Sequence, residues 1–460
     1  MKPSAAVRWA IVGIVLGAGF QARDARATLH HYPGGFASLQ EAFNTCEEGD
    51  TLLIAPGIYS QPQHRRVDYS GPGFTVLSEA GPEDTVFDCG FADYWLQLSG
   101  AGSASQRMVL AGITVRNYRD FEVIASLACT ETVLTLDTMV FRDNPDNYFG
   151  TGASFSDGDI QCIGCVFREC NEVGLILVRS TYDVSGCLFM NNSGGSSGGG
   201  AEFSNCTGAV RDSQFIDNVA TRGGGLALKL GGSAELDGLL FGGNQSGTWG
   251  GGLEASLYGE VTLRNSVFVD NRAWYWGGGV AFLGSWDVDD RLIVENCDFV
   301  DNWAQRWGSA ITAYSSAELH VTDCSFVGNE TEDTFPNIGA AILCALWSPF
   351  YMERTIVADT RRGVGIRIGD PDTVSIQCSN VWGNADGNFD NIDDPTGLDG
   401  NISLDPLFCG TVGGDSLALM NTSPCLPANN ACGVLMGNHG QGCETVRTES
   451  RSWGSIKSLY

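Results

Sequence analysis

A four-residue motif, Phe-x-x-Asn, returns along the middle of the chain at a nearly constant spacing. Neighbouring copies lie 22 to 31 residues apart, which is the signature of a repeat protein whose units stack on one another. Residues 111–384 are therefore expected to form one regular array. Complete copies begin at Phe141, Phe189, Phe215, Phe241, Phe268, Phe299 and Phe326, and degenerate copies at Phe167, Ile356 and Val381.

A glycine-rich motif keeps step with the first. Between the two motifs lie short alternating apolar runs, such as Val261, Leu263 and Phe268, and nothing in the repeat has a helical pattern. A unit of short strands and tight turns fits one coil of a parallel β-solenoid, whose coils stack at roughly 4.8 Å. Propeller repeats are longer, and paired hairpins would need two-residue Asn-Gly turns, which are scarce here. The glycine motif begins at Gly198, Gly223, Gly250 and Gly277 and decays at Gly308 and Gly339.

Stacking explains both motifs physically. In a solenoid each repeat position lies above its own copy, so an Asn at a turn can donate and accept along its column, and Phe rings can stack inside. Glycine before a strand permits positive φ at the tightest corner. We interpret the repeated Phe, Asn and Gly residues as scaffold.

The two repeated motifs resemble those of known families of repeat proteins. The paired motifs resemble the passenger repeats of polymorphic outer-membrane proteins, and the coil resembles the right-handed β-helix of the pectate lyase superfamily. The likeness covers roughly residues 110 to 385 and implies an all-β, right-handed parallel β-helix of about a dozen coils. It is specific for fold and poor for function. Polymorphic outer-membrane proteins also carry a C-terminal translocating barrel, and residues 385–460 are too short and too weakly alternating to supply one.

Residues 1–27 are predicted to be a secretory signal. Lys2 and Arg8 precede an apolar run from Ala10 to Phe20, and Ala25-Arg26-Ala27 is a small-x-small cleavage site. The run is too short to span a membrane and no later stretch qualifies, so we expect a secreted or cell-surface protein without a transmembrane segment.

The segment 28–110 is expected to hold the N-terminal cap and the first irregular coils. Ser38 is a predicted N-cap and Glu41 completes a capping box, so a short helix should cover the first open edge. The following Gly49-Asp50-Thr51 and Pro56-Gly57-Ile58-Tyr59 resemble the opening of many secreted β-helix proteins.

The chain contains 16 cysteines, an even number that favours disulfides in an exported protein. Cys46 could pair with Cys89. Cys165 with Cys187, and Cys297 with Cys324, fall in neighbouring coils, where they could form bridges or a reduced stack of small buried residues. Residues 385–443 are expected to form a disulfide-rich C-terminal cap, and residues 444–460 a flexible tail. We expect bridges among Cys409, Cys425, Cys432 and Cys443.

The acidic balance narrows the range of partners. With 26 Lys and Arg against 54 Asp and Glu, the formal net charge is −28, so nucleic acid and anionic polymers are unfavourable ligands. Cationic partners or divalent ions fit better, although an acidic surface commonly serves solubility alone.

Tryptophans supply the clearest binding candidate. Trp249, Trp276 and Trp307 each stand immediately before the glycine motif, so they should stack along the axis. Three others lie close in sequence, and an exposed aromatic strip would suit the apolar faces of sugar rings. Alternatively, the rings only pack on one another and cover the glycine corners. The three others are Trp274, Trp286 and Trp303.

Catalytic candidates are weaker. A lyase of the resembled superfamily would need acidic calcium ligands facing a strongly basic residue. Acidic residues gather at 287–290, followed by Arg291, and at Asp370 and Asp372, but neither set stands in a lyase motif. Of the short sequence motifs typical of galacturonase-like hydrolases, only Asp-Asp is present. The catalytic candidates of the first set are Asp287, Asp289, Asp290 and Arg291.

One segment resembles the start of a calcium loop. Asp386, Asn388 and Asp390 alternate correctly, but Asn391 replaces the expected glycine and Gly397 the bidentate glutamate. We therefore predict no cofactor, with calcium as the one ion to test.

Three functions remain open for a single-domain exported β-helix. The leading hypothesis is a non-enzymatic recognition or adhesion protein that binds glycan through the tryptophan strip and the loop at 284–290. The second is a divergent polysaccharide lyase or glycoside hydrolase. The third is a purely structural surface protein whose partner is another protein.

Overall fold

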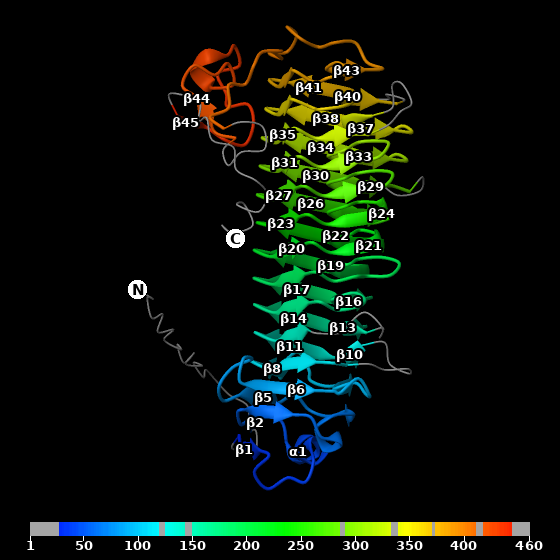
Figure 1. Ribbon diagram of the computed structural model, residues 1–460, viewed down its shortest axis with the longest axis vertical. Helices are drawn as coiled ribbons and strands as arrows, with labels where there is room; N and C mark the ends of the chain where they lie inside the picture. The colour runs from blue at the N-terminus through cyan, green and yellow to red at the C-terminus, as the bar shows by residue number, and fades with distance from the viewer. Residues whose placement is uncertain are drawn as a thin grey trace.

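The structure is a computed structural model that describes residues 27–118, 125–142, 150–285, 290–332, 339–369, 373–410 and 417–443. The chain winds into a tall right-handed parallel β-helix whose coils climb from the N-terminal to the C-terminal end (Figure 1). It has about 15 turns, slightly more than the dozen expected. The all-β solenoid predicted from the repeats is thus confirmed.

Three parallel sheets form the stack, and their strands pair with their copies one coil away. The long sheet has 25 strands, the Phe sheet 13 and the short sheet five. The first two extend over most of the stack, whereas the third spans only residues 219–331. The strands of the Phe sheet are β3 (Gly57–Tyr59), β6 (Thr85–Asp88), β9 (Thr114–Arg116), β12 (Val140–Arg142), β15 (Val166–Arg168), β18 (Leu188–Met190), β20 (Gln214–Ile216), β23 (Leu240–Gly242), β27 (Val267–Val269), β31 (Asp298–Val300), β35 (Ser325–Val327), β39 (Ile356–Ala358) and β42 (Asn380–Trp382). The short sheet consists of β21 (Val219–Arg222), β24 (Gln245–Trp249), β28 (Arg272–Ala273), β32 (Trp303–Ala304) and β36 (Glu330–Thr331).

The long sheet supplies the remaining walls of each coil. Its strands are β1 (Leu29–Tyr32), β2 (Thr51–Ile54), β4 (Val67–Tyr69), β5 (Thr75–Ser78), β7 (Leu96–Ser99), β8 (Met108–Ala111), β10 (Ala125–Thr130), β11 (Val133–Asp137), β13 (Thr151–Ser156), β14 (Asp159–Ile163), β16 (Leu175–Val178), β17 (Thr181–Ser185), β19 (Ala201–Arg211), β22 (Leu226–Asp237), β25 (Leu253–Ser256), β26 (Glu260–Arg264), β29 (Val280–Leu283), β30 (Arg291–Glu295), β33 (Ile311–Tyr314), β34 (Glu318–Thr322), β37 (Ala340–Ala345), β38 (Phe350–Glu353), β40 (Val364–Ile368), β41 (Val374–Gln377) and β43 (Phe389–Asp390).

The repeated phenylalanines form a stack inside the Phe sheet, as predicted. Phe241 and Phe268 have ring centroids 4.5 Å apart, and all seven neighbouring pairs from Phe141 to Phe326 lie within 5.1 Å and 12° of parallel. The stack fills the core and fixes the register of the coils.

The repeated asparagines form a hydrogen-bonded column beside this stack. Asn244 Nδ2 donates to the carbonyl oxygen of Phe215 at 2.8 Å and to Asn271 Oδ1 at 2.9 Å, and the Asn244 amide donates to the same Oδ1. The buried Asn244 side chain thereby gains hydrogen-bond partners in both the previous and the next coil. Asn192, Asn218, Asn244, Asn271, Asn302 and Asn329 are all fully buried members; Asn144 lies outside the described residues.

A second column unites several of the cysteines with hydroxyl residues. The Cys297 amide donates to Cys324 Sγ at 3.4 Å, and the Cys324 amide to Thr355 Oγ1 at 3.3 Å, just as the Leu239 amide donates to Ser266 Oγ. The four cysteines of this column are free thiols, so the reduced alternative describes the structure. In the structure Val357, and not Ile356 as the sequence suggested, takes the place of the repeat Phe in its coil. The members of the column stand two residues before the repeat Phe, or before Val357 and Val381 in the last two coils: Cys165, Cys187, Ser213, Ser266, Cys297, Cys324, Thr355 and Ser379.

A helix covers the first coil. Helix α1 (Leu39–Thr45) begins after Ser38, whose Oγ accepts from the Glu41 amide at 3.1 Å, and it buries Phe43 against Phe74, with ring centroids 5.3 Å apart. The predicted capping helix is confirmed. A short 3-10 turn, Pro62–His64, lies nearby. Cys46 and Cys89 are buried free thiols, so the expected bridge between them is wrong.

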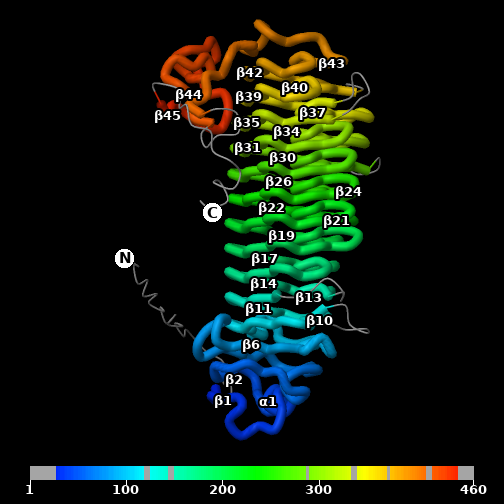
Figure 2. Tube along the Cα trace, in the orientation of Figure 1, coloured from blue at the N-terminus to red at the C-terminus, as the bar shows by residue number. Residues whose placement is uncertain are grey.

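Residues 417–443 form a C-terminal lobe beside the upper coils rather than above them (Figures 1 and 2). It contains β44 (Leu419–Met420), β45 (Gln441–Cys443) and a 3-10 turn, Pro427–Asn429. Of the four cysteines expected to bridge, Cys409 pairs with Cys443, whereas Cys432 pairs with Cys378 and Cys425 stays free. Within the described residues, no helix has the length and apolarity that crossing a membrane requires.

Candidate functional site

The predicted tryptophan column exists. Trp249 and Trp276 have ring centroids 5.2 Å apart, Trp276 and Trp307 4.6 Å apart, and both pairs lie within 10° of parallel. Each ring precedes a glycine corner, and at Gly277, with φ +65°, an added Cβ would lie 2.3 Å from the Val280 carbonyl oxygen. The corner therefore requires glycine, and it sets the indoles directly above one another.

The flat faces of these three indole rings are covered by the side chains stacked on them. Each indole is half-buried, and Tyr314 packs at 5.1 Å from Trp276 and 5.5 Å from Trp307. A sugar ring stacks on an aromatic face rather than on its edge. The column therefore has the geometry of the second interpretation, in which the rings pack on one another.

A buried ion pair closes the lower end of the column. The Arg222 guanidinium lies 4.4 Å from the centroid of Trp249 and contacts the fully buried carboxylate of Glu254. Burial raises the pKa of Glu254, and Arg222 opposes that rise. Glu254 Oε2 has no hydrogen-bond partner among the described residues.

A separate groove, with a volume of about 490 Å³, runs over the outer face of the short sheet. Its outward side chains follow one register column, in which Gln245 pairs with Arg272 and Arg272 pairs with Trp303. Trp274 forms the adjoining wall, and Val219 and Thr221 lie toward the other end. The groove therefore crosses successive coils along the axis of the β-helix.

Two tryptophans in this groove present usable faces. Trp274 is 55% exposed, and its ring meets Trp303 edge-on, with centroids 6.1 Å apart and planes 84° apart. Because the contact is T-shaped, it leaves indole faces uncovered by the partner ring. Within the described chain, no carboxylate lies within ion-pair distance of Arg272, so its charge is available to a ligand.

Two acidic residues near Trp303, one on its own coil and one on the next, pair with arginines of a later coil. Asp301 pairs with Arg361 at 2.6 Å, and Glu330 with Arg362 at 3.4 Å. Burial raises the pKa of Asp301 to about 6, although Arg361 opposes the rise. This carboxyl therefore retains its proton closer to neutrality than an ordinary aspartate.

Comparison with known families identifies the chain at the level of fold. The model for "Right handed beta helix region" matches residues 150–388, which is more than half of the sequence. The chain belongs to this right-handed β-helix family. A comparison with curated proteins gives no match.

Solved β-helices resemble it only distantly. The catalytic domain of a GH87 α-1,3-glucanase in complex with tetrasaccharides is 11% identical over 82% of this chain and 70% of that one, with a TM-score of 0.42. Pectate lyase Pel9A is 13% identical over 63% and 78%, with a TM-score of 0.38. A PL6 alginate lyase complex with trisaccharide is 10% identical over 93% and 97%, with a TM-score of 0.44. We draw no activity from these likenesses.

The catalytic candidates are not brought together in the described part of this β-helix. Trp286, Asp287 and Asp289 lie outside it. Asp290 is buried, and its Oδ2 accepts from the Ser285 amide; Arg291 lies 3.1 Å from Glu318. The side chains of Asp290 and Arg291 therefore connect neighbouring strands and loops. The other acidic pair, Asp370 and Asp372, is also outside the described residues.

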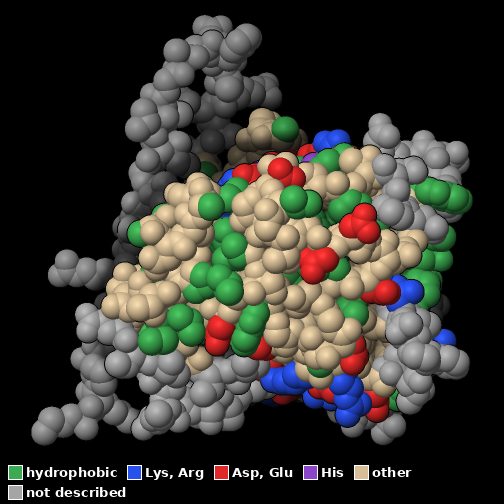
Figure 3. Space-filling model, turned by 90° about the horizontal axis from the view of Figure 1, so that it is seen from above, with side chains coloured by type: hydrophobic (Ala, Val, Ile, Leu, Met, Phe, Trp, Pro, Cys, Tyr) green, Lys and Arg blue, Asp and Glu red, His purple; other side chains and the backbone are tan. Residues whose placement is uncertain are grey.

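Each of the candidate calcium ligands contacts a different residue by a hydrogen bond or an ion pair. Asp386 accepts from the Gly363 amide at 2.8 Å, Asn388 accepts from Asn384, and Asp390 pairs with Arg367 at 2.8 Å. No group of three His, Cys, Asp or Glu residues suited to a metal ion occurs in the described ranges. Seen from above, acidic side chains are scattered rather than gathered in one patch (Figure 3).

Sequence reasoning missed the groove, although a signal was present. The residue directly after each member of the asparagine column points outward on the short sheet, because the side chain of the Asn itself points inward. Comparing the residue at this position in successive repeats would have revealed the column of side chains that lines the groove. Its residues are Val219, Gln245, Arg272, Trp303 and Glu330.

Proposed function

We propose that this protein is an exported glycan-binding protein that holds a sugar chain in the groove over the short sheet. The observation that carries the proposal is the pair Trp274 and Trp303, two indoles that line an open groove together with Arg272, which has no ion-pair partner among the described residues. The two disulfides support the exported state, since such bonds persist in oxidising compartments.

The groove has the features that carbohydrate sites combine. Indole faces offer apolar contact to the C–H faces of sugars, while the Gln245 amide and the Arg272 guanidinium offer several hydrogen-bond donors in one row. Because the row crosses coils that repeat at roughly 4.8 Å, a linear chain lying along the axis would meet a new side chain at each coil.

The binding experiment compares two tryptophan variants. Tryptophan fluorescence and calorimetry would follow the full mature chain against plant, algal and bacterial polysaccharides. We expect Trp274→Ala to weaken binding by about tenfold or more, equivalent to about 1.4 kcal/mol. Trp276→Ala, which removes a ring from the column, is the matched control and should leave the affinity nearly unchanged. Equal losses in both variants, or no binding by the wild type, would sink the proposal.

A polysaccharide lyase or hydrolase is the second candidate, favoured by Asp301. A carboxyl that holds its proton up to about pH 6, two residues before Trp303 in the chain, could serve as a general acid. Release of new reducing ends, abolished by Asp301→Asn, would establish catalysis. Saturable binding without release would retain the non-enzymatic function.

A further inference from the structure

The C-terminal lobe is attached along the outer face of the Phe sheet in a regular order. The Gly437 amide donates to the Arg354 carbonyl oxygen at 2.7 Å, the Asn438 amide to Ser325 Oγ at 3.1 Å, and His439 Nε2 lies 2.7 Å from Asp298 Oδ2. Three consecutive residues of the lobe thus contact three successive coils, moving back toward the N-terminal end of the stack.

Apolar packing lies beneath these contacts. Ile356 and Ala358, which point out of β39, join Leu419, Leu426 and Met436 of the lobe in one buried cluster. The cluster is separate from the main core, where the intervening Val357 packs inward. The lobe therefore covers an apolar part of the outer face of the β-helix.

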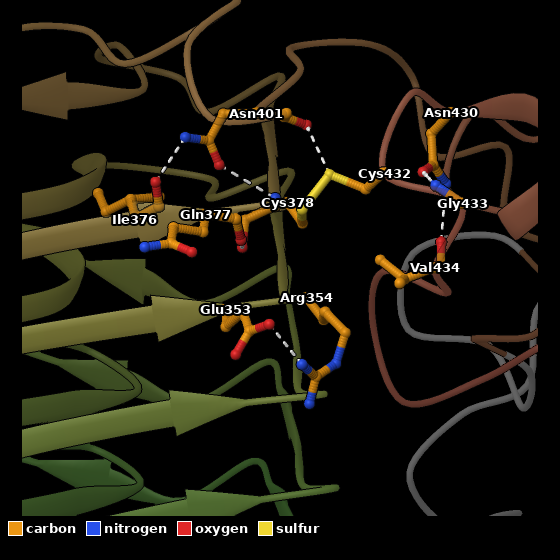
Figure 4. The surroundings of a disulfide bond; sticks show 12 residues. Glu353, Arg354, Ile376, Gln377, Cys378, Asn401, Asn430, Cys432, Gly433 and Val434 are labelled. Atoms are coloured by element: carbon orange, nitrogen blue, oxygen red, sulfur yellow. Dashed lines mark hydrogen bonds and ion pairs between the residues drawn. A yellow bond between two sulfur atoms is a disulfide. The ribbon is translucent and has the colours of Figure 1, made fainter.

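One covalent linkage joins the lobe to the coils. Cys432 of the lobe is bonded to Cys378, which follows β41 at the edge of the coil (Figure 4). The other disulfide, between Cys409 and Cys443, ties the end of the lobe to the segment that precedes it. Reducing Cys378–Cys432 would leave the lobe held by its non-covalent contacts.

One ionisable pair stands among those contacts. Asp298 is 6% exposed, and its Oδ1 has no hydrogen-bond partner among the described residues. His439 is the one titratable side chain between Met436 and Gly442. On the facing coils, the Arg354 guanidinium is engaged by Asp323 and Glu353, so no described cation other than His439 contacts Asp298.

The direction of the pH effect follows from this pair. The hydrogen bond to Asp298 raises the pKa of His439 above its ordinary value of 6.5. The contact is thus strongest when the imidazole is protonated, and it weakens as pH rises through the raised pKa. Deprotonation would leave the Asp298 carboxylate buried without a cation, which is costly.

We propose that the lobe is a releasable cover over the outer faces of β31, β35 and β39, held by the Cys378–Cys432 disulfide and by the His439–Asp298 pair. Release requires both linkages to open. Two molecules of a thiol reductant supply the two electrons and two protons that convert the disulfide into two thiols and become a disulfide themselves; a phosphine does the same with one water and becomes a phosphine oxide. Loss of one proton from His439 opens the second linkage. The uncovered face would expose Ile356 and Ala358 to solvent.

The buried thiol of Cys425 reports on release. It lies at the contact between lobe and coils, where Asn380 Nδ2 is 3.1 Å from its Sγ. The full mature chain would be treated with a maleimide at about pH 5 and about pH 8, with and without a phosphine reductant. Peptide mapping would then distinguish Cys425 from the other thiols.

Comparing variants at one pH removes the intrinsic pH dependence of thiol labelling. With reductant at about pH 5, we expect His439→Gln to label Cys425 about tenfold or more faster than the wild type. His320→Gln is the matched control, because His320 pairs with Glu318 at 2.6 Å on a different sheet. Without reductant, labelling should stay slow in all three proteins. Equal labelling of His439→Gln and wild type under reduction, or fast labelling of the unreduced wild type, would overturn the proposal.

Discussion

The guanidinium of Arg222 lies 4.4 Å over the indole ring of Trp249 and at the same time contacts the buried carboxylate of Glu254. One side chain thus ends the tryptophan column and neutralises a charge on β25. The pair is asymmetric, since the Arg222 side chain is 33% exposed and that of Glu254 is 0% exposed.

This asymmetry predicts unequal costs for removing each partner. Arg222→Met would strand a buried carboxylate and should lower the free energy of unfolding by about 3–5 kcal/mol. Glu254→Gln keeps the shape and leaves a cation that can reach water, so we expect about 1 kcal/mol. Urea unfolding at neutral pH measures both. A larger loss in Glu254→Gln would contradict the assignment of the pair.

The asparagine column predicts a large effect from a small change. Asn244→Ala removes a side chain that serves groups in both neighbouring coils and should cost about 3 kcal/mol or more. Gln245→Ala, one residue later and outward-facing, should change stability by no more than about 0.5 kcal/mol. Similar unfolding midpoints for the two variants would refute the role given to the column.

The thiol and hydroxyl column predicts that its cysteines can be exchanged for serine. Cys324→Ser keeps a donor and an acceptor where Ser213 and Ser266 already stand, so its unfolding free energy should stay within about 1 kcal/mol of the wild type. Cys344→Ser places a hydroxyl in the main apolar core and should cost about 1–3 kcal/mol.

Alkylation of the denatured, unreduced chain should label the 12 free cysteines. Fewer labels would mean that further bridges form.

Asp301 predicts a pH-dependent loss of stability. Its folded pKa of about 6 exceeds the ordinary aspartate value of 3.8, so the folded state holds the proton more tightly, and stability should fall as pH rises between these values. In Asp301→Asn that fall should vanish. Asp157→Asn is the opposite control, because the hydrogen bond from Arg179 lowers the pKa of Asp157. Urea midpoints should show the stability difference between the wild type and Asp301→Asn falling as pH rises from 3.8 to about 6. The difference between the wild type and Asp157→Asn should instead rise with pH below 3.8 and stay flat above it.

Much of the fold was predictable because each coil repeats the same physical problem. The spacing of Phe241 and Phe268 fixed the coil length, and stacked rings and paired amides followed from placing equal positions above one another. Ser38 and Glu41 similarly predicted a helix from local capping chemistry alone.

The groove and the lobe depend on information that no single repeat contains. Val219, Gln245, Arg272 and Trp303 share one outward column but differ in chemistry, so the repeat pattern gives no consensus at that position. The contact between His439 and Asp298 joins residues 141 positions apart, and no local pattern predicts it. The tryptophan column was predicted as a stack, but only the packing shows that its faces are occupied.

The asparagine column also bears on how long such a protein can be. Each Asn donates its main-chain and side-chain N–H groups to Oδ1 of the next Asn, and its own Oδ1 accepts the same two donors from the previous Asn. Every junction between these members is therefore chemically interchangeable. A coil could be gained or lost between Asn218 and Asn302 without leaving an orphaned group. The reach of the molecule is therefore an adjustable quantity that can vary while the two ends stay the same, and a coil gained or lost there would lengthen or shorten the groove with it.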